Sequence, residues 1–336
     1  MKLSILIVNW NSRDLLRDCL KSVYRTCEAV SPQVVVVDGG SFDGCAEMLA
    51  TEFPEVDFVQ SPENIGFGRC NNLGFAKVTG EALLLLNPDT ELRPGAVEAL
   101  LEELVRHPEA GVIGARLLNS DQSLQFASIH HLPTAWNVVM DTDRARRRWW
   151  RRHGSRLAAA TTEVEAVSGA CMMMRAETFR RLGGFDPRFF MYAEDMDLCF
   201  RVRHAGLKIL HAPAAVVLHH GGGSSRTRFS KFSGVMIREA IHVYMRKNLG
   251  AFQAGLYRLS MAISATLRIP VLATARLLAK NERRDVLQAA LLKWWTVLRW
   301  CLGMEKWAAK HFFPTASAPC FPAGPRPRPP RGYHAK

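Results

Sequence analysis

The sequence predicts an α/β protein with a mostly parallel central sheet covered by helices and a C-terminal helical extension. Short runs of uninterrupted apolar residues, such as VVVV at 34–37 and LLLL at 83–86, alternate with segments of helical periodicity. Such runs are typical of parallel strands that are buried on both faces. After about residue 235 the pattern changes to long helical segments. A chain of 336 residues is long enough for one large domain and an appendage.

The first hundred residues predict four strands with helices between them. The expected strands are KLSILIVNWN, QVVVVDGGS, VDFVQS and ALLLLNPD, and the expected helices are SRDLLRDCLKSVYRT, CAEMLATEF and CNNLGFAKV. Ser12 is the expected N-cap of the first helix. Ligands of parallel sheets collect at the carboxyl ends of the strands. Asp38 and Asp89, which each follow a strand, are therefore expected on the ligand side.

Later segments extend this pattern and suggest the domain boundaries. We expect strands at GVIGARLL, VEAVSGACMMMRA and LKILHAPAAVVLHH, and helices at AETFRRLGGFD, which Gly-Gly would close, and AEDMDLCFRVRHAG. The expected division is an α/β domain at 1–230, a basic amphipathic helical extension at 231–313 and a tail at 314–336. Seven prolines in that tail predict disorder.

Charge is distributed unevenly along the chain. The net charge is +13, yet residues 1–100 hold 8 basic and 14 acidic residues, so the remaining 236 residues carry +19. Such asymmetry suggests a polyanionic partner, either a membrane surface or nucleic acid, with a basic solvated surface as the alternative. The segment RARRRWWRRH at 144–153 would suit lipid headgroups, nucleic acid or a mobile charged loop. Because no nucleic-acid motif accompanies it, we favour anionic lipid and expect no nucleic-acid partner.

The extension has the composition of helices that lie in a membrane interface. Residues 251–313 contain ten basic and three acidic residues and four tryptophans, Trp294, Trp295, Trp300 and Trp307. Helices packed on the domain are the alternative. No run of 18 uninterrupted apolar residues occurs, so we expect no spanning helix, and Pro270 should kink or break its helix.

Other features of the sequence suggest a cytosolic protein. The eight cysteines form no CxxC pair and lie mostly in apolar surroundings, which predicts reduced thiols. The N-terminal apolar run becomes polar too soon for a signal peptide.

Two strand ends carry candidate binding residues. In VNWN at 8–11, Trp10 could stack on a flat ring while Asp38 bonds its polar edge; packing of the ring and helix capping by the acid are the alternatives. In Asn87-Pro88-Asp89, an exposed carboxylate suits Mg²⁺ or Mn²⁺, which take hard oxygen ligands together with phosphate oxygens. A simple turn is the alternative for this motif.

Two later motifs carry candidate catalytic groups. FFMYAEDMDLCFR at 189–201 places Glu194, Asp195 and Asp197 within four residues, and their repulsion favours one basic carboxylate for proton abstraction. Acids are also common in a first helical turn. HHGGGSS at 219–225 combines an imidazole that could bind a metal with glycines that allow close approach to phosphate; a structural histidine pair is the alternative.

Together these segments resemble the family 2 glycosyltransferases, in particular the rhamnosyltransferase-like branch of bacterial surface polysaccharide synthesis. The resemblance covers roughly residues 1–225 in order, through SILIVNWN, VVVVDGGSFDG, ENIGFGRCNNLGFAKVTGEALLLLNPDTELRPG, VSGACMMMRAETFRRLGGFDPRFFMYAEDMDLCFRVRHAGLKI and APAAVVLHHGGGSS. It implies the GT-A fold, with one half that binds a nucleotide-diphosphate sugar and another that binds the acceptor.

The resemblance also implies roles for individual residues. It assigns donor binding to Trp10, Asn11, Asp38, Asn72 and Asn87, the divalent metal to Asp89 and His219, the catalytic base to Asp195 and electrostatic support to Glu194. Two positions depart from the branch. It usually reads VDNAS where this chain has Asp38-Gly39-Gly40, and the first residue of its DxD motif is asparagine here. Base selectivity is therefore open, and metal binding depends more heavily on Asp89.

The expected function is inverting transfer of a sugar, with rhamnose as a candidate, from a nucleotide-diphosphate donor to a hydroxyl of a lipid-linked or cell-surface glycan. The enzyme would use Mg²⁺ or Mn²⁺ and would lie on the inner face of the cell membrane. A transferase with a soluble acceptor, a non-catalytic nucleotide-sugar-binding scaffold and a nucleic-acid binder are the alternatives. The presence of both Asp89 and Asp195 argues against the scaffold.

Overall fold

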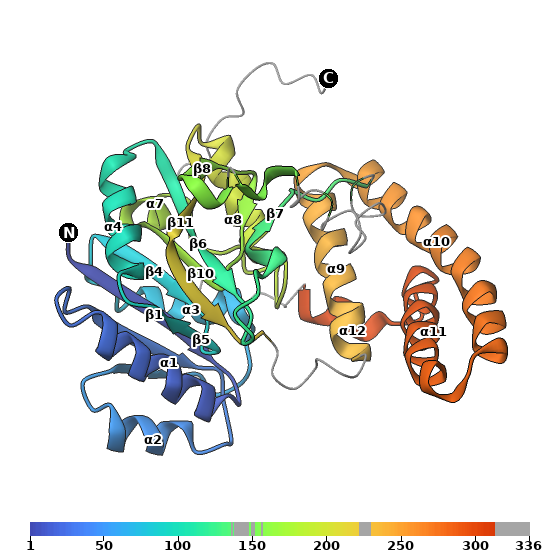
Figure 1. Ribbon diagram of the computed structural model, residues 1–336, viewed down its shortest axis with the longest axis horizontal. Helices are drawn as coiled ribbons and strands as arrows, with labels where there is room; N and C mark the ends of the chain where they lie inside the picture. Colours follow the sequence, from blue (N-terminus) through green and yellow to red (C-terminus); the bar gives the residue numbers. More distant parts are fainter. Residues whose placement is uncertain (136, 138–147, 149–151, 156, 222–229, 313–336) are drawn as a thin grey trace.

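The structure is a computed structural model that describes residues 1–312 except 136, 138–147, 149–151, 156 and 222–229. It has two parts, a sheet domain and a helical extension at its side (Figure 1). The tail at 314–336 and most of the RARRRWWRRH segment lie outside the described residues, so their predicted disorder and lipid contacts stay predictions.

The sheet domain alternates strands and helices in the predicted order. Its first half consists of β1 (Leu3–Asn9), α1 (Arg13–Thr26), β2 (Gln33–Asp38), α2 (Cys45–Glu52), β3 (Asp57–Gln60), α3 (Phe67–Phe75), β4 (Ala82–Leu86), β5 (Thr90–Leu92) and α4 (Ala96–Arg106). Its second half consists of β6 (Ala110–Leu118), β7 (Ile129–His130), β8 (Thr162–Glu163), β9 (Ala166–Val167), β10 (Cys171–Arg175), α7 (Ala176–Arg181), α8 (Glu194–His204) and β11 (Lys208–His219).

The strands form a mixed but mostly parallel sheet, as predicted. Their order is β3-β2-β1-β4-β10-β6-β11-β5, and β8 pairs with β11 at the side. Neighbours from β3 to β4 are parallel, and β11 is parallel to β6. β10 runs antiparallel to both β4 and β6, and β5 runs antiparallel to β11. β10 thereby brings the segment before it to the edge where β1, β2 and β4 end.

The leucine run of β4 is buried on both faces of the sheet. Leu84 and Leu86 pack in one apolar cluster, with α1, α2 and α4, while Leu83 and Leu85 pack in the other, with α3, α7 and α8. Successive side chains of a strand point to opposite faces, so a strand at the centre of a covered sheet needs apolar residues throughout. Each buried leucine contributes about 1.5–3 kcal/mol.

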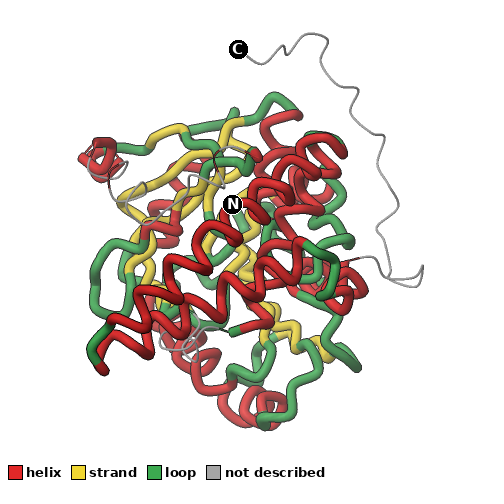
Figure 2. Tube along the Cα trace, turned by 90° about the vertical axis from the view of Figure 1, so that its right-hand side faces the viewer, coloured by secondary structure: helices red, strands yellow, loops and turns green. Residues whose placement is uncertain are grey.

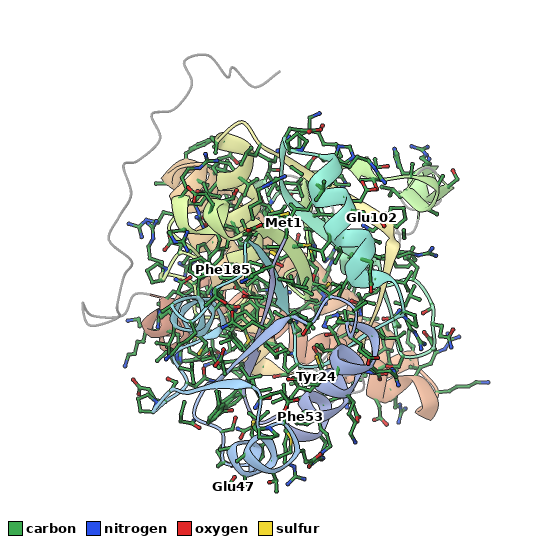
Figure 3. All side chains as sticks on the ribbon, turned by 90° about the vertical axis from the view of Figure 1, so that its left-hand side faces the viewer. Met1, Tyr24, Glu47, Phe53, Glu102 and Phe185 are labelled. Carbon is green, nitrogen blue, oxygen red and sulfur yellow. The ribbon has the colours of Figure 1, made fainter. Side chains whose placement is uncertain are left out.

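Helices cover each face closely. On the first face the rings of Tyr24 in α1 and Phe53 after α2 stack with centroids 5.9 Å apart (Figure 3). On the other face a Cβ at Gly74 of α3 would lie 2.5 Å from side-chain atoms of Leu6 and Val37, so only glycine lets the helix approach the sheet this closely.

Ser12 lies at the N-cap position of α1, as predicted, and its carbonyl accepts from the N–H of Leu16 at 2.8 Å. Its hydroxyl, however, donates to the carbonyl of Trp10 at 3.2 Å and makes no cap bond. Instead the backbone N–H of Arg13 donates to the carboxylate of Asp43, 30 positions away, at 2.8 Å. A contact between distant segments has replaced the local cap that the sequence suggested.

The extension contains α9 (Lys231–Asn248), α10 (Ala251–Leu278), α11 (Asn281–Cys301) and α12 (Lys306–Phe312). It is joined to the sheet domain by an apolar core, which includes Phe189, Phe190, Tyr244, Trp300 and Phe312. The ammonium of Lys247 on α9 also pairs with the carboxylates of Asp186, at 2.7 Å, and Asp197. Part of the extension therefore packs on the domain, which was one of the two expected arrangements.

Two expectations concern α10. The helix runs through Pro270 over 28 residues, so the proline does not break it, and the expected kink stays a prediction. In the described part of the chain it is also the one helix long and apolar enough to cross a membrane. Its most apolar stretch of 18 residues has a mean hydropathy of 1.4, and 11% of that stretch is buried. Its sequence has no long uninterrupted apolar run, because the arginines Arg258, Arg268 and Arg276 divide it, and the expectation of no spanning helix stays a prediction.

Candidate active site

Asp38 lies at the carboxyl edge of the sheet, directly beside the end of β1. Its carboxylate accepts hydrogen bonds from the amide of Asn9 at 2.9 Å, from the N–H and hydroxyl of Ser41 at 2.8 and 2.6 Å, and from the amide of Gln60 at 2.8 Å. Burial alone would raise the pKa of Asp38, but these bonds, chiefly those from Ser41, outweigh it and lower the pKa. Asp38 is 1% exposed and organises the loop after β2; a contact with a nucleoside stays a prediction.

Trp10 and Asn11 follow β1 at the same edge. Asn11 has a left-handed backbone with φ 49°, its side-chain oxygen accepts from the N–H of Phe42 at 3.0 Å, and its own N–H donates to the hydroxyl of Ser41 at 2.8 Å. These bonds fix the loop while the ring of Trp10 stays 48% exposed. An exposed ring on a fixed loop suits stacking, although the stacking itself stays a prediction.

The side chain of Asn72 bonds to the backbone of a distant segment. Its amide donates to the carbonyl of Phe185 at 2.7 Å, and its oxygen accepts from the N–H of the same residue at 2.9 Å. Asn72 therefore fixes the backbone after α7, and its role in donor binding stays a prediction.

Asp89 and His219 form a pair at the end of β4 and β11. The Nε2 atom of His219 lies 3.3 Å from Oδ1 of Asp89, and the side-chain carbonyl of Gln125 lies 2.6 Å from Nδ1 of His219. The side-chain carbonyl of Gln125 accepts the proton of Nδ1, so Nε2 points toward the carboxylate of Asp89. Either a proton or a cation can lie between Nε2 and that carboxylate. An imidazole and a carboxylate fit a divalent ion that takes its remaining ligands from phosphate and water.

Neighbouring contacts hold this pair in place. The N–H of His220 donates to the carbonyl of Asp89 at 2.8 Å, and its Nε2 lies 2.7 Å from the carboxylate of Glu91. The Oδ1 atom of Asn87 is buried and has no hydrogen-bond partner within the described residues. A buried acceptor of this kind is suited to a hydroxyl or N–H of a ligand.

The backbone before β10 connects this pair to the candidate base. The N–H of Asn87 donates to the carbonyl of Ala170 at 2.9 Å, and the N–H of Gly169 donates to Oδ2 of Asp195 at 2.9 Å. The second oxygen of Asp195 accepts from the N–H of Met196 at 2.7 Å. Gly169 and Ala170 therefore link the backbone of the Asn-Pro-Asp motif to the carboxylate of Asp195. The two acids that the sequence separates by over a hundred positions lie at one edge of the sheet.

The start of α8 has an uncommon backbone. Tyr192 and Ala193, which precede the helix, both have positive φ, 70° and 59°. Such angles are costly for residues other than glycine and often occur at functional sites. They turn the chain so that Asp195 lies in the first turn of α8 and faces Gly169.

Glu194 is buried beside the candidate base. Its Oε2 atom has no hydrogen-bond partner within the described residues, and its Cβ lies 3.8 Å from the position of a Cβ at Gly68. Burial, and then the charge of Asp195, raise the pKa of Glu194 to about 8. A raised pKa disfavours the charged form, and the electrostatic support that the resemblance implies for Glu194 stays a prediction.

Asp197 is also structural. It is fully buried and bonded to Arg201 at 2.8 Å, to Asn248 at 3.0 Å and to Lys247. Of the three clustered acids, Asp195 alone is partly exposed.

Sequence reasoning missed Asn9 and Gln125. Asn9 was within VNWN, and its direct register with Asp38 in the parallel pair β1–β2 could have indicated it. Gln125 lies 94 positions from His219 in a loop without a motif, so no sequence signal indicated it.

The fold and the site define a class. A mostly parallel sheet with an acid–histidine pair and a second acid at its carboxyl edge is the arrangement expected of a GT-A transferase. The sequence profile described as glycosyl transferase family 2 matches residues 4–183, so the chain belongs to that family. A profile described as the N-terminal domain of galactosyltransferase matches residues 153–220. The predicted family is therefore confirmed, and the chain is a glycosyltransferase.

Curated relatives support the predicted rhamnosyltransferase-like branch. The N-acetylglucosaminyl-diphospho-decaprenol L-rhamnosyltransferase of Mycobacterium tuberculosis is 31% identical over 208 residues, which cover 57% of this chain and 67% of the relative. Rhamnosyltransferase WbbL of Escherichia coli K12 is 22% identical over 252 residues, which cover 73% of this chain and 93% of the relative.

Solved structures confirm the GT-A fold. The mannosyltransferase PcManGT of Pyrobaculum calidifontis, in complex with GDP-Man and Mn²⁺, has a TM-score of 0.57 at 15% identity and covers 91% of this chain and 87% of its own. GalNAc-T7 with UDP, GalNAc and Mn²⁺ has a TM-score of 0.52 at 17% identity and covers 72% of this chain and 48% of its own.

Proposed function

We propose that this glycosyltransferase inverts the configuration of the transferred sugar, requires Mg²⁺ or Mn²⁺, and acts on a lipid-linked glycan at the cytoplasmic face of the membrane. One observation carries the proposal: Gly169 and Ala170 connect the Asn-Pro-Asp motif to the carboxylate of Asp195, so both acids lie at one edge of the sheet. Inversion in a single step needs one group that stabilises the leaving phosphate and, at the same time, another that accepts the proton of the incoming hydroxyl.

The leaving group belongs beside Asp89 and His219. These two residues would hold the divalent ion, and the bound ion would neutralise negative charge on the nucleotide diphosphate. Within the described residues no cluster of three histidine, cysteine or acidic side chains could hold a metal alone. A site with two protein ligands depends on donor oxygens for the rest, which predicts that ion and donor bind together.

Asp195 acts as the general base. The bonds from Gly169 and Met196 occupy one lone pair on each carboxylate oxygen and hold the group rigid, while two lone pairs remain. As the acceptor oxygen forms its bond to the anomeric carbon, the bond from that carbon to the phosphate oxygen breaks, and the hydroxyl proton passes to Asp195. Attack opposite the leaving phosphate inverts the anomeric centre.

The identity of the substrates is proposed from the relatives. The names of the Mycobacterium tuberculosis and Escherichia coli relatives specify rhamnosyl transfer, and the former also specifies a decaprenol-linked acceptor. We propose dTDP-rhamnose as the donor and a polyprenyl-diphosphate-linked saccharide as the acceptor. The peripheral location on the membrane follows from that acceptor.

A donor panel tests this function. The purified protein is given dTDP-, UDP- and GDP-sugars with Mn²⁺, Mg²⁺ or EDTA, and a polyprenyl-diphospho-N-acetylglucosamine acceptor, and the product is followed by mass spectrometry. We expect transfer from dTDP-rhamnose that EDTA abolishes. Transfer that persists in EDTA would contradict the metal requirement, and transfer to free N-acetylglucosamine at an equal rate would contradict the lipid-linked acceptor.

A further inference from the structure

The outward face of α10 is a continuous apolar surface. Figure 1 shows α10 at the outer edge of the extension, with α11 on its inner side, and Figure 2 shows the helices that cover this side of the molecule. Its exposed large apolar side chains, each between 40% and 82% exposed, are Phe252, Leu256, Leu259, Ile263, Leu267, Val271, Leu277 and Leu278. The first six follow one another at three or four residues, and Leu277 and Leu278 continue the same side about two turns after Val271. We call these eight residues the α10 face.

Two of the three arginines of α10 point toward α11. The guanidinium of Arg258 donates to the carbonyls of Cys301 at 3.0 Å and Trp300 at 2.8 Å, and that of Arg268 lies 4.2 Å from the ring centroid of Trp294. Both arginines therefore face α11, and the α10 face carries no charge. An uncharged face of this length is unusual on a surface that only meets water.

Basic residues surround the turn where α10 meets α11. Arg276, Lys280, Arg283 and Arg284 are exposed there. Against them the sequence has two acids, Glu282 and Asp285, so residues 276–285 carry a net charge of +2. An apolar face bordered by cations complements an anionic bilayer, in which acyl chains lie next to negative headgroups.

We propose that the α10 face binds an anionic lipid bilayer and lies in its plane, which extends the proposed function by naming the surface that meets the membrane. A spanning orientation is disfavoured because α11 packs against α10 and would carry Arg283, Arg284 and Arg299 into the hydrocarbon with it. In the plane of the interface those residues stay in water or among headgroups while the α10 face is buried.

The α10 face is coupled to the catalytic residues. α10 begins at Ala251, three residues after Asn248, and Asn248 and Lys247 both bond Asp197 in the first turn of α8. Asp195 lies in that same turn. A bilayer bound at the α10 face would therefore hold the candidate base at a fixed distance from the lipid surface, as a lipid-linked acceptor requires.

Vesicle binding by the full-length protein tests the surface. The variant Ile263→Glu/Leu267→Glu places two charges on the α10 face, and Val105→Glu, at a position on α4 that is 64% exposed, is the matched control. Co-sedimentation is measured with vesicles of phosphatidylglycerol and phosphatidylcholine and with vesicles of phosphatidylcholine alone. We expect the double variant to bind the mixed vesicles at least tenfold more weakly than the wild type, and the control to bind within twofold of it. The wild type should bind neutral vesicles more weakly than mixed ones.

Transfer to two acceptors separates this proposal from the proposed function. The transfer rate of the double variant should equal that of the wild type with a water-soluble, short-chain acceptor and should be at least tenfold lower with the vesicle-bound acceptor. If the wild type transfers no sugar at all while the double variant still loses vesicle binding, the proposed function fails and the lipid-binding surface stands. Vesicle binding by the double variant equal to that of the wild type would overturn the surface. A wild-type dimer in sedimentation that the double variant dissociates would assign the α10 face to a second copy and overturn it as well.

Discussion

The substitution Asp195→Asn removes the proposed base with little change of shape. A general base contributes about 10²–10⁴ in rate, so kcat should fall by that factor while the KM for the donor stays within twofold. The structure adds a second consequence. Both carboxylate oxygens accept a backbone N–H, from Gly169 at 2.9 Å and from Met196 at 2.7 Å. The amide of asparagine has only one oxygen, so one of these N–H groups must face an NH₂ group.

That mismatch predicts a loss of stability as well as of rate. A buried donor that loses its partner costs about 1–3 kcal/mol, so Asp195→Asn should unfold at a lower temperature than the wild type. Asp14→Asn, which removes a 70% exposed carboxylate on α1, is the control and should change neither rate nor stability appreciably.

The assay combines steady-state transfer kinetics with thermal unfolding, with and without donor and Mn²⁺. Donor and Mn²⁺ should raise the unfolding temperatures of wild type and Asp195→Asn by similar amounts, because the leaving-group side of the site is intact. A variant with a wild-type kcat would refute the assignment of the base. A variant that has lost the donor-induced shift would show that Asp195 acts in donor binding instead.

Three further predictions concern the rest of the site and its support. Asp89→Ala should abolish stimulation by Mn²⁺ and most of the transfer activity, measured as a metal titration; stimulation that persists would assign the ion to other residues. Glu194→Gln mimics the protonated carboxyl. Because the pKa of Glu194 is raised to about 8, the wild type loses stability as the pH rises from 4.5 toward that value, and the variant does not. The unfolding temperature of the variant relative to the wild type should therefore be higher at pH 8 than at pH 5, and an equal difference at both would contradict a raised pKa. Lys247→Met removes the ammonium from the buried carboxylate of Asp197 and the mostly buried carboxylate of Asp186, and should cost up to about 3–5 kcal/mol in denaturant unfolding. The exposed Lys208→Met should cost far less, and equal losses would mean that the buried pairs contribute little.

The strand that precedes Asn87-Pro88-Asp89 shows how much of the fold the sequence determines. A run such as Leu83–Leu86 is stable only where both faces are covered, so the sheet, its parallel strands and the edge that carries Asp38 and Asp89 could all be predicted. The reversed direction of β10 could not be predicted, because apolar periodicity contains no information on strand direction. That reversal brings Gly169 and Ala170 between the two acids.

The surroundings of several site residues depend on contacts between distant segments, which the sequence does not show. Glu194 is next to Asp195 in sequence, yet Glu194 is buried and Asp195 is partly exposed. A single sequence does not show which of two adjacent acids points inward. Asn72 and Gln125 have their partners 113 and 94 positions away. The helical segment that contains α10 was predicted, but its uncharged face was not, because the sequence does not show that Arg268 contacts Trp294 of the neighbouring helix.

The most direct measurement is a crystal structure of the protein with a nucleotide-diphosphate sugar and Mn²⁺, in which the anomalous signal of manganese locates the ion. We expect one manganese peak within bonding distance of Asp89 and His219, with the anomeric carbon between that ion and the carboxylate of Asp195. A manganese peak away from this pair, or a donor whose anomeric carbon faces away from Asp195, would contradict the arrangement on which the proposed reaction depends.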